Sequence, residues 1–134
     1  MGRGSRLAVL GSPISHSKSP ALHAAAYRVL GLDWSFEAIE LAEGGVRDFF
    51  RGLGDSWRGF AVTMPLKRAV FDQVDDVDAV ARLAGAINTI VCGESSRWGF
   101  NTDVYGVERA LGELGVSGPR SAVLLGAGAT AASV

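Results

Sequence analysis

Short apolar runs alternate with stretches of helical periodicity along these 134 residues, and this alternation constrains the fold more than any other feature. The apolar runs are five to eight residues long and are bounded by Gly or by polar clusters, as buried strands are. They predict strands at residues 6–10, 34–41, 59–63, 87–92 and 97–101. The intervening periodicity predicts helices at residues 19–30, 46–53, from about 66, 75–83 and 102–114. We therefore expect an α/β domain with a mostly parallel sheet flanked by helices.

Local signals place the ends of several elements. Ser19 is expected to cap the first helix, with Pro20 at its first position, and Gly31 to close it. Residues 93–96 predict the turn of a hairpin. Either Thr102 or Asp103 is expected to cap the last helix.

Composition narrows the choice of partners and compartment. Thirteen basic and fourteen acidic side chains give a net charge of −1, which argues against a nucleic-acid or anionic-membrane partner. No apolar run approaches the roughly 20 residues that a bilayer span needs, and the run near the N-terminus is too short for a signal peptide. The single Cys92 has no disulfide partner, and no metal-binding set surrounds it. We expect a protein of the reducing cytoplasm without a metal.

A second structural unit begins near the end of the chain. The apolar run from Ser121 predicts a strand, and Gly126, Gly128 and Ala131 follow it as G-x-G-x-x-A. Glycines at these positions let a backbone approach the pyrophosphate of a dinucleotide. A strand without neighbours is an open pairing edge, so we expect this tail to be disordered, folded back, or paired with another copy.

Four polar clusters are expected just after strands, and in a parallel sheet such positions share one end, where ligands bind. The alternative, that each cluster is a cap or a turn, explains them one at a time. The clusters are Ser15 to Ser17, Thr63 to Lys67, Asn88 with Thr89, and Asn101 to Asp103.

Lys67 is the most informative of these residues. The chain holds eleven Arg and only two Lys, so a Lys at this position suggests chemistry that Arg performs poorly. An ammonium can exchange its proton, whereas a guanidinium stays charged. An exposed helical lysine is the alternative. Asp103 is either a helix cap or a carboxylate paired with Lys67, and the sequence leaves both open.

Other polar residues offer hydrogen bonds to a ligand. Ser15 and Ser17 alternate, so both hydroxyls can face one side of an extended loop and bind a carboxylate, or they simply solvate that loop. Asn88 is an amide at a strand, where an unpartnered Asn is disfavoured.

Five sequence blocks, taken in order, resemble the shikimate dehydrogenase family: SPISHSKSPALH, GFAVTMPLK, GAINT, GFNTDVYG and LLGAGATAAS. The resemblance implies a substrate-binding domain at residues 1–118. It also implies that residues 119–134 begin a truncated Rossmann domain that binds NADP. The implied activity is the reversible reduction of 3-dehydroshikimate to shikimate, on the shikimate pathway to chorismate and the aromatic amino acids. On this view the fragment alone does not turn over.

The resemblance also implies roles for individual residues. Ser15 and Ser17 would bind the substrate carboxylate, and Lys67 with Asp103 would form the catalytic pair. The remaining substrate contacts would be Thr63 and Asn88, and the pyrophosphate loop would comprise Gly126, Ala127, Gly128 and Ala129.

Two departures from the family pattern leave alternatives open. Ala61 and Ala24 stand where the family often has Asn, and the glycine loop is GAGATA rather than GAGGA. One alternative is an NAD-preferring quinate/shikimate dehydrogenase. Another is a non-catalytic module that binds a shikimate-like ligand or serves assembly. The expected partner is a small-molecule substrate, and a homodimer is left open.

Overall fold

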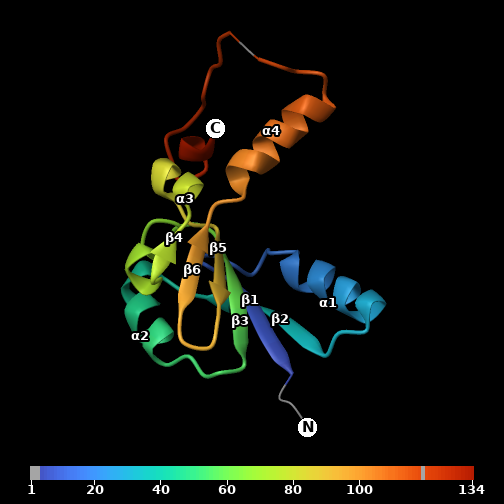
Figure 1. Ribbon diagram of the computed structural model, residues 1–134, viewed down its shortest axis with the longest axis vertical. Coiled ribbons are helices and arrows are strands. Elements are labelled where there is room, and N and C mark those ends of the chain that lie inside the picture. Colours follow the sequence, from blue (N-terminus) through green and yellow to red (C-terminus); the bar gives the residue numbers. More distant parts are fainter. Residues whose placement is uncertain (1–3, 119) are drawn as a thin grey trace.

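A six-stranded sheet organises the computed structural model, which describes residues 4–118 and 120–134 (Figure 1). The strand order is β2-β1-β3-β5-β6-β4, and only β5 runs antiparallel to its neighbours. The mostly parallel α/β fold is therefore confirmed. The strands are β1 (Ser5–Gly11), β2 (Trp34–Glu40), β3 (Trp57–Val62), β4 (Asp76–Val77), β5 (Thr89–Cys92) and β6 (Arg97–Phe100).

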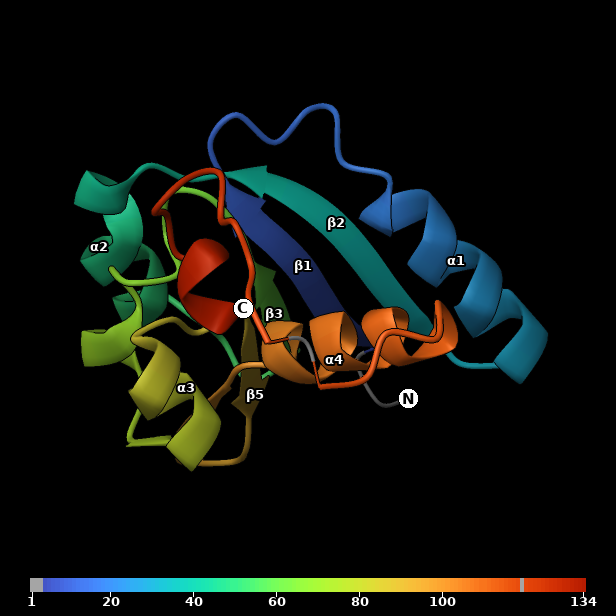
Figure 2. The same ribbon diagram turned by 90° about the horizontal axis from the view of Figure 1, so that it is seen from above.

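Helices α1 and α2 lie on opposite sides of this sheet (Figure 2). Helix α4 projects away from it, and the chain then returns to end beside α3 (Figure 1). The helices are α1 (Ser19–Leu30), α2 (Val46–Arg51), α3 (Ala79–Ala84) and α4 (Asp103–Glu113), with short 3-10 helices at Glu43–Gly45, Phe71–Gln73 and Ala131–Ser133.

The main core lies on the face of the sheet that α2 covers. Successive side chains of a strand point to opposite faces, so Ala8 and Leu10 of β1 join this core, while Val9 points the other way. On that second face His23 of α1 stacks on Phe36 of β2, with ring centroids 3.9 Å apart. Helix α1 therefore covers the second face of the sheet at β2 and β1.

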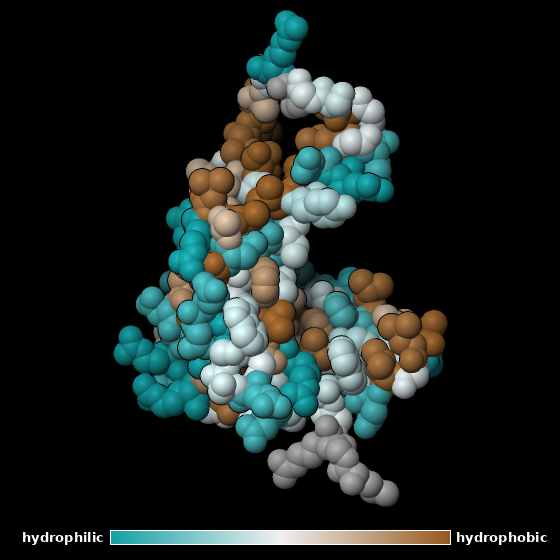
Figure 3. Space-filling model, viewed as in Figure 1, coloured by the Kyte–Doolittle hydropathy of each residue, from teal (hydrophilic) through white to brown (hydrophobic). Residues whose placement is uncertain are grey.

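Apolar side chains also remain exposed. They gather over α1 and over the segment that follows α4, both visible in Figure 3. Val29 is 83% exposed, and Val123 and Leu125 are 89% and 95% exposed. None of the helices in the described part of the chain has the length and apolarity to cross a membrane.

The helix predicted from about residue 66 is wrong. Residues 64–70 form consecutive turns that lead into the 3-10 helix Phe71–Gln73. The carbonyl oxygen of Lys67 accepts a hydrogen bond from Ile87 N at 2.8 Å, whereas a continuing helix would give it to residue 71. A contact with a distant segment thus replaces a helical hydrogen bond.

Three further predictions need correction. Residues 75–83 form β4 and then α3, whose N-cap Asp78 accepts a hydrogen bond from Ala81 N at 2.8 Å. Lys18, not Ser19, occupies the N-cap position of α1, so Pro20 is its second residue rather than its first, while Gly31 ends the helix as predicted. Residues 121–125 form no strand, because no strand of the sheet pairs with them.

The expected domain boundary touches Pro119, which lies outside the described residues. The tail after it folds back onto the domain, which was one of its three predicted arrangements. Among residues 120–134 only Ser133 is buried, and Thr130 and Ser133 both hydrogen-bond to residues of the domain.

Gly59 is required where β3 and β5 approach each other. A Cβ at Gly59 would lie 2.5 Å from the carbonyl oxygen of Ile90, whereas one at Gly54 would meet nothing within 4 Å. We expect Gly59→Ala to lower the free energy of unfolding by about 1–3 kcal/mol. Gly54→Ala is the matched control and should change it by less than about 0.5 kcal/mol. Urea unfolding measures both, and equal values would contradict this packing.

Candidate active site

Three parallel strands end on one side of the molecule, and this end of the sheet is called the site end below. Gly11, Val62 and Phe100 are the last residues of β1, β3 and β6. The prediction that every polar cluster follows a strand is wrong for Asn88, which precedes β5. Because β5 runs antiparallel, its beginning lies at the same end, and Asn88 still joins the other clusters.

Both the backbone and the side chain of Lys67 are fixed by hydrogen bonds. Its carbonyl oxygen is bound by Ile87 N, and its neighbour Leu66 is fully buried. Only 9% of Lys67 is exposed, so the alternative of an exposed helical lysine is excluded. Its Nζ donates to Asp103 Oδ2 at 2.5 Å, across 36 positions of the sequence. The pairing that the sequence left open is therefore present.

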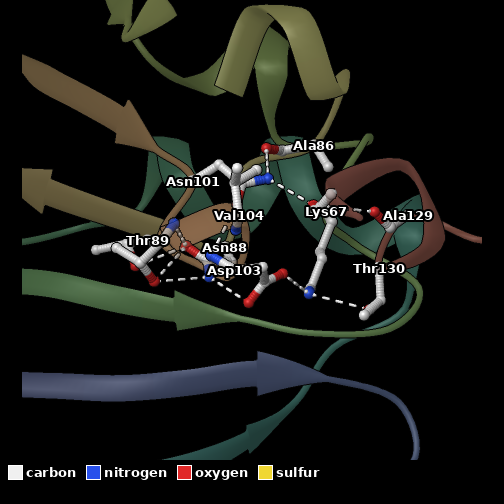
Figure 4. A network of polar contacts seen from close by, with 11 residues as sticks. Lys67, Ala86, Asn88, Thr89, Asn101, Asp103, Val104, Ala129 and Thr130 are labelled. Atoms are coloured by element: carbon white, nitrogen blue, oxygen red, sulfur yellow. Dashed lines mark hydrogen bonds and ion pairs between the residues drawn. The ribbon is translucent and has the colours of Figure 1, made fainter. Parts of the chain in front are cut away.

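Asn88 completes the surroundings of the Asp103 carboxylate (Figure 4). Its Nδ2 donates to Asp103 Oδ1 at 2.7 Å, so each carboxylate oxygen has its own donor. The other half of the amide is fixed too, because Asn88 Oδ1 accepts from Thr102 N and from Thr89 Oγ1 at 3.1 and 2.9 Å. The carboxylate is thereby oriented toward Lys67.

Asn101 caps α4, a role that the sequence analysis did not assign. Thr102 occupies the N-cap position without a side-chain cap. Instead Asn101 Oδ1 accepts from Asp103 N at 2.9 Å and from Val104 N at 3.4 Å. Its Nδ2 donates to Ala86 O at 2.9 Å, and the residue is only 6% exposed. An Asn two positions before an acidic residue at a helix start is the signal that could have indicated it.

The other predicted substrate-binding residues stand apart from this network. Thr63 follows β3 and lines the same cavity as Lys67. Ser15 is exposed and Ser17 half-buried on the loop between β1 and α1, where Ser17 Oγ accepts from Ser19 N at 3.3 Å. Within the described residues, no hydrogen bond joins either serine to Lys67.

Glu40 anchors that loop and was missed from the sequence. Its carboxylate accepts from Ser12 Oγ at 2.5 Å and from Ile14 N at 2.9 Å. The Ser12 hydroxyl, then the Ile14 amide, lower the pKa of Glu40 below its ordinary value of 4.5. A strand-terminal Glu carries no sequence signal for a contact 26 residues away.

The glycine segment at residues 126–129 faces Lys67 across a cavity of about 540 Å³. Gly126 has φ +118°, and a Cβ at Gly126 or Gly128 would meet nothing within 4 Å. Gly126, Gly128 and Ala129 line the cavity, and Ala127 does not. This open backbone fits the close approach of a dinucleotide.

A cavity of about 690 Å³ lies at the opposite end of the sheet, around the turn between β5 and β6. None of the predicted site residues lines it. Across residues 4–118 and 120–134, no group of three His, Cys, Asp or Glu side chains is placed to hold a metal ion.

The site-end network supports proton transfer. Lys67 as an ammonium is a proton donor, and Asp103 holds it in one position. A ligand oxygen that gains negative charge near Nζ would be stabilised and could take its proton.

Comparisons with known proteins show which family this chain resembles. Residues 9–90 match the model of the shikimate dehydrogenase substrate binding domain. A shikimate dehydrogenase (NADP(+)) of Thermus thermophilus is 40% identical over 133 residues, which cover 96% of this chain and 49% of that protein. The protein of the same name from Rubrobacter xylanophilus is 42% identical over 139 residues. The match covers 99% of this chain and 48% of that protein.

A solved structure extends the likeness to the fold. The shikimate 5-dehydrogenase of Thermus thermophilus in complex with shikimate superposes with a TM-score of 0.89 at 38% identity, covering 97% of this chain and 50% of that one. The chain thus spans about half the length of the relatives it matches.

The Glu40 anchor predicts a pH dependence. Because its folded-state pKa is lowered, its contribution to stability is complete above the ordinary value of 4.5 and is lost as the pH falls through the lower folded-state pKa. In an NMR titration the Ile14 amide should therefore shift with a midpoint below 4.5. Glu40→Gln should abolish this shift, and Glu43→Gln is the control that should keep it. A midpoint at the ordinary value would contradict the anchor.

Proposed function

This chain belongs to the shikimate dehydrogenase family, and we propose that it is the substrate-binding half of an NADP-dependent enzyme that interconverts 3-dehydroshikimate and shikimate. Residues 1–118 form the substrate-binding domain, and residues 119–134 begin a Rossmann domain. The complete enzyme joins both halves on the shikimate pathway to the aromatic amino acids.

The observation that carries the proposal is the Lys67–Asp103 pair, 2.5 Å apart beside the glycine segment. In the direction of reduction, the carbonyl carbon of the substrate gains a hydride and its oxygen gains a proton from Lys67 Nζ. Asp103 holds the ammonium in place and accepts a hydrogen bond from a substrate hydroxyl. Solvent then returns a proton to Lys67, and the reverse reaction uses the neutral amine as the base.

Four further residues bind the substrate in this proposal. Ser15 and Ser17 donate hydroxyl protons to its carboxylate, from a loop that Glu40 holds at the site end. Thr63 and Asn88 contact the ring hydroxyls. Ala61 offers no side-chain amide there, so discrimination between related ring acids rests on the remaining contacts.

The proposed cofactor is NADP, which when bound supplies the hydride. The backbone of Gly126, Ala127, Gly128 and Ala129 is the segment that would hold its pyrophosphate. The open Cβ positions of Gly126 and Gly128 support this assignment.

Two alternatives remain to be separated by experiment. An NAD-preferring quinate/shikimate dehydrogenase would bind quinate as well as shikimate. A non-catalytic module would bind its ligand without needing Lys67. The protein is proposed to work in the cytoplasm on a small-molecule substrate, with no nucleic-acid or membrane partner.

Ligand binding can be tested on this chain. Shikimate at one hundred times its dissociation constant should raise the free energy of unfolding by about 2.7 kcal/mol. Replacing both Ser15 and Ser17 with Ala should remove most of that gain, whereas the exposed Ser95→Ala should keep it. Thermal unfolding with shikimate and with quinate measures the effect. An equal gain with quinate would favour the first alternative, and no gain with either would count against a preformed substrate half.

Catalysis is tested in the complete enzyme. Lys67→Met keeps the length of the side chain but removes the proton donor, so we expect kcat to fall about 10²- to 10⁴-fold. The chain's other lysine, the exposed Lys18 of the loop before α1, provides the control Lys18→Met, which should leave kcat unchanged. Retention of kcat in Lys67→Met would overturn the assigned role.

A further inference from the structure

Two hydroxyl groups that follow the glycine segment, those of Thr130 and Ser133, form hydrogen bonds with Lys67 and Asn101. The proposed mechanism assigns neither hydroxyl a role. Thr130 Oγ1 accepts a hydrogen bond from Lys67 Nζ at 3.3 Å, across 63 positions. Ser133 Oγ accepts from Asn101 Nδ2 at 3.0 Å, across 32 positions. Figure 4 shows Thr130 beside Lys67, on the side away from Asp103.

Local geometry explains why both hydroxyls face the network. Thr130 is the N-cap of the 3-10 helix Ala131–Ser133. Side chains three residues apart lie on the same side of such a helix, so a contact at residue 130 brings residue 133 to the same surface. The turn is closed by hydrogen bonds from Ala132 N to Gly128 O and from Ser133 N to Thr130 O.

The contact with Thr130 also sets the direction of Lys67. An ammonium has three N–H donors and no acceptor, so the threonine oxygen must be the acceptor. Asp103 takes a second donor, which leaves the third N–H for a ligand. The hydroxyl proton of Thr130 must then point away from Nζ. Because Thr130 is exposed and lines the cavity of about 540 Å³, its hydroxyl proton is free to bond to a ligand or to solvent there.

The large apolar side chains of residues 120–134 contribute little packing against the rest of the structure. Val123, Leu125 and Val134 are 89%, 95% and 68% exposed. Ser133, by contrast, is 4% exposed, and its partner Asn101 is the residue that caps α4 at Asp103. The two hydroxyl contacts therefore carry the docking of the glycine segment.

We propose that Thr130 and Ser133 are positioning residues that hold the glycine segment against the Lys67–Asp103 pair. This inference rests on the proposed function. Through these contacts the loop that binds the cofactor and the group that donates the proton keep one relative placement. Thr130 fixes the Lys67 ammonium directly, and Ser133 acts through Asn101 on the start of α4.

Hydrogen exchange tests the docking without reference to activity. In this chain, Thr130→Val and Ser133→Ala should each speed exchange of the Ala132 and Ser133 amides about tenfold, the factor expected for one lost hydrogen bond. Thr130→Ser keeps the hydroxyl and should exchange like the wild type. Ser95→Ala, in the distant turn between β5 and β6, is the control. Unchanged exchange in Thr130→Val, or equal acceleration in Thr130→Ser, would overturn the docking.

Kinetics of the complete enzyme test the positioning. Thr130→Val should lower kcat about tenfold and leave the KM for shikimate within about twofold, because the bond aims the proton donor rather than binding substrate. Thr130→Ser should restore kcat. If kcat is unchanged in Thr130→Val, Thr130 does not position Lys67, even if hydrogen exchange of the Ala132 and Ser133 amides is faster. A wrong proposed function would be recognised separately, because the wild-type enzyme would then show no shikimate oxidation. That result would not depend on the hydrogen-exchange measurements.

Discussion

The hydrogen bond from Ile87 N to the carbonyl oxygen of Lys67 is the contact on which the site depends. It removes from residues 64–70 the bond that would continue them as a helix. It also ties the backbone of Lys67 to the residue just before Asn88, so the two site residues are held near each other. With Leu66 buried on one side, the lysine is left to point along the site end, toward α4. The pair with Asp103 follows from that direction.

Much of the fold was predictable because it depends on local pattern. Five of the six strands were expected from apolar runs, and α1 from its proline, its periodicity and Gly31. The two-residue β4 was missed, since so short a strand has no periodicity of its own. The wrong helix after residue 66 and the wrong strand at 121–125 share one cause. In each case the outcome depends on which distant backbone groups are available to pair.

The sequence predicted which residues form the site better than it predicted how they are arranged. Lys67, Asn88 and Asp103 were chosen by chemical type and position, and the structure brings them together. The distances among them arise from packing that no local pattern encodes. Asn101 belonged to a predicted cluster, but its hydrogen bonds to Ala86 O and Ser133 Oγ were not predicted. Glu40 was missed altogether. In both cases the partner lies in a distant segment of the chain. The binding roles of the two loop serines and of the threonine after β3 stay predictions.

The two ends of the β5–β6 hairpin differ in how well they can tolerate an insertion. At one end Asn88 N donates to Phe100 O at 3.0 Å, which holds Asn88 and Asn101 side by side. Adding one residue within either strand would reverse the faces of the residues beyond it and separate the two amides. The four residues that join the strands lie at the far end, where a longer loop would leave the register intact. Evolution or engineering can therefore lengthen this turn, or insert a peptide there, while the chemistry at the other end persists.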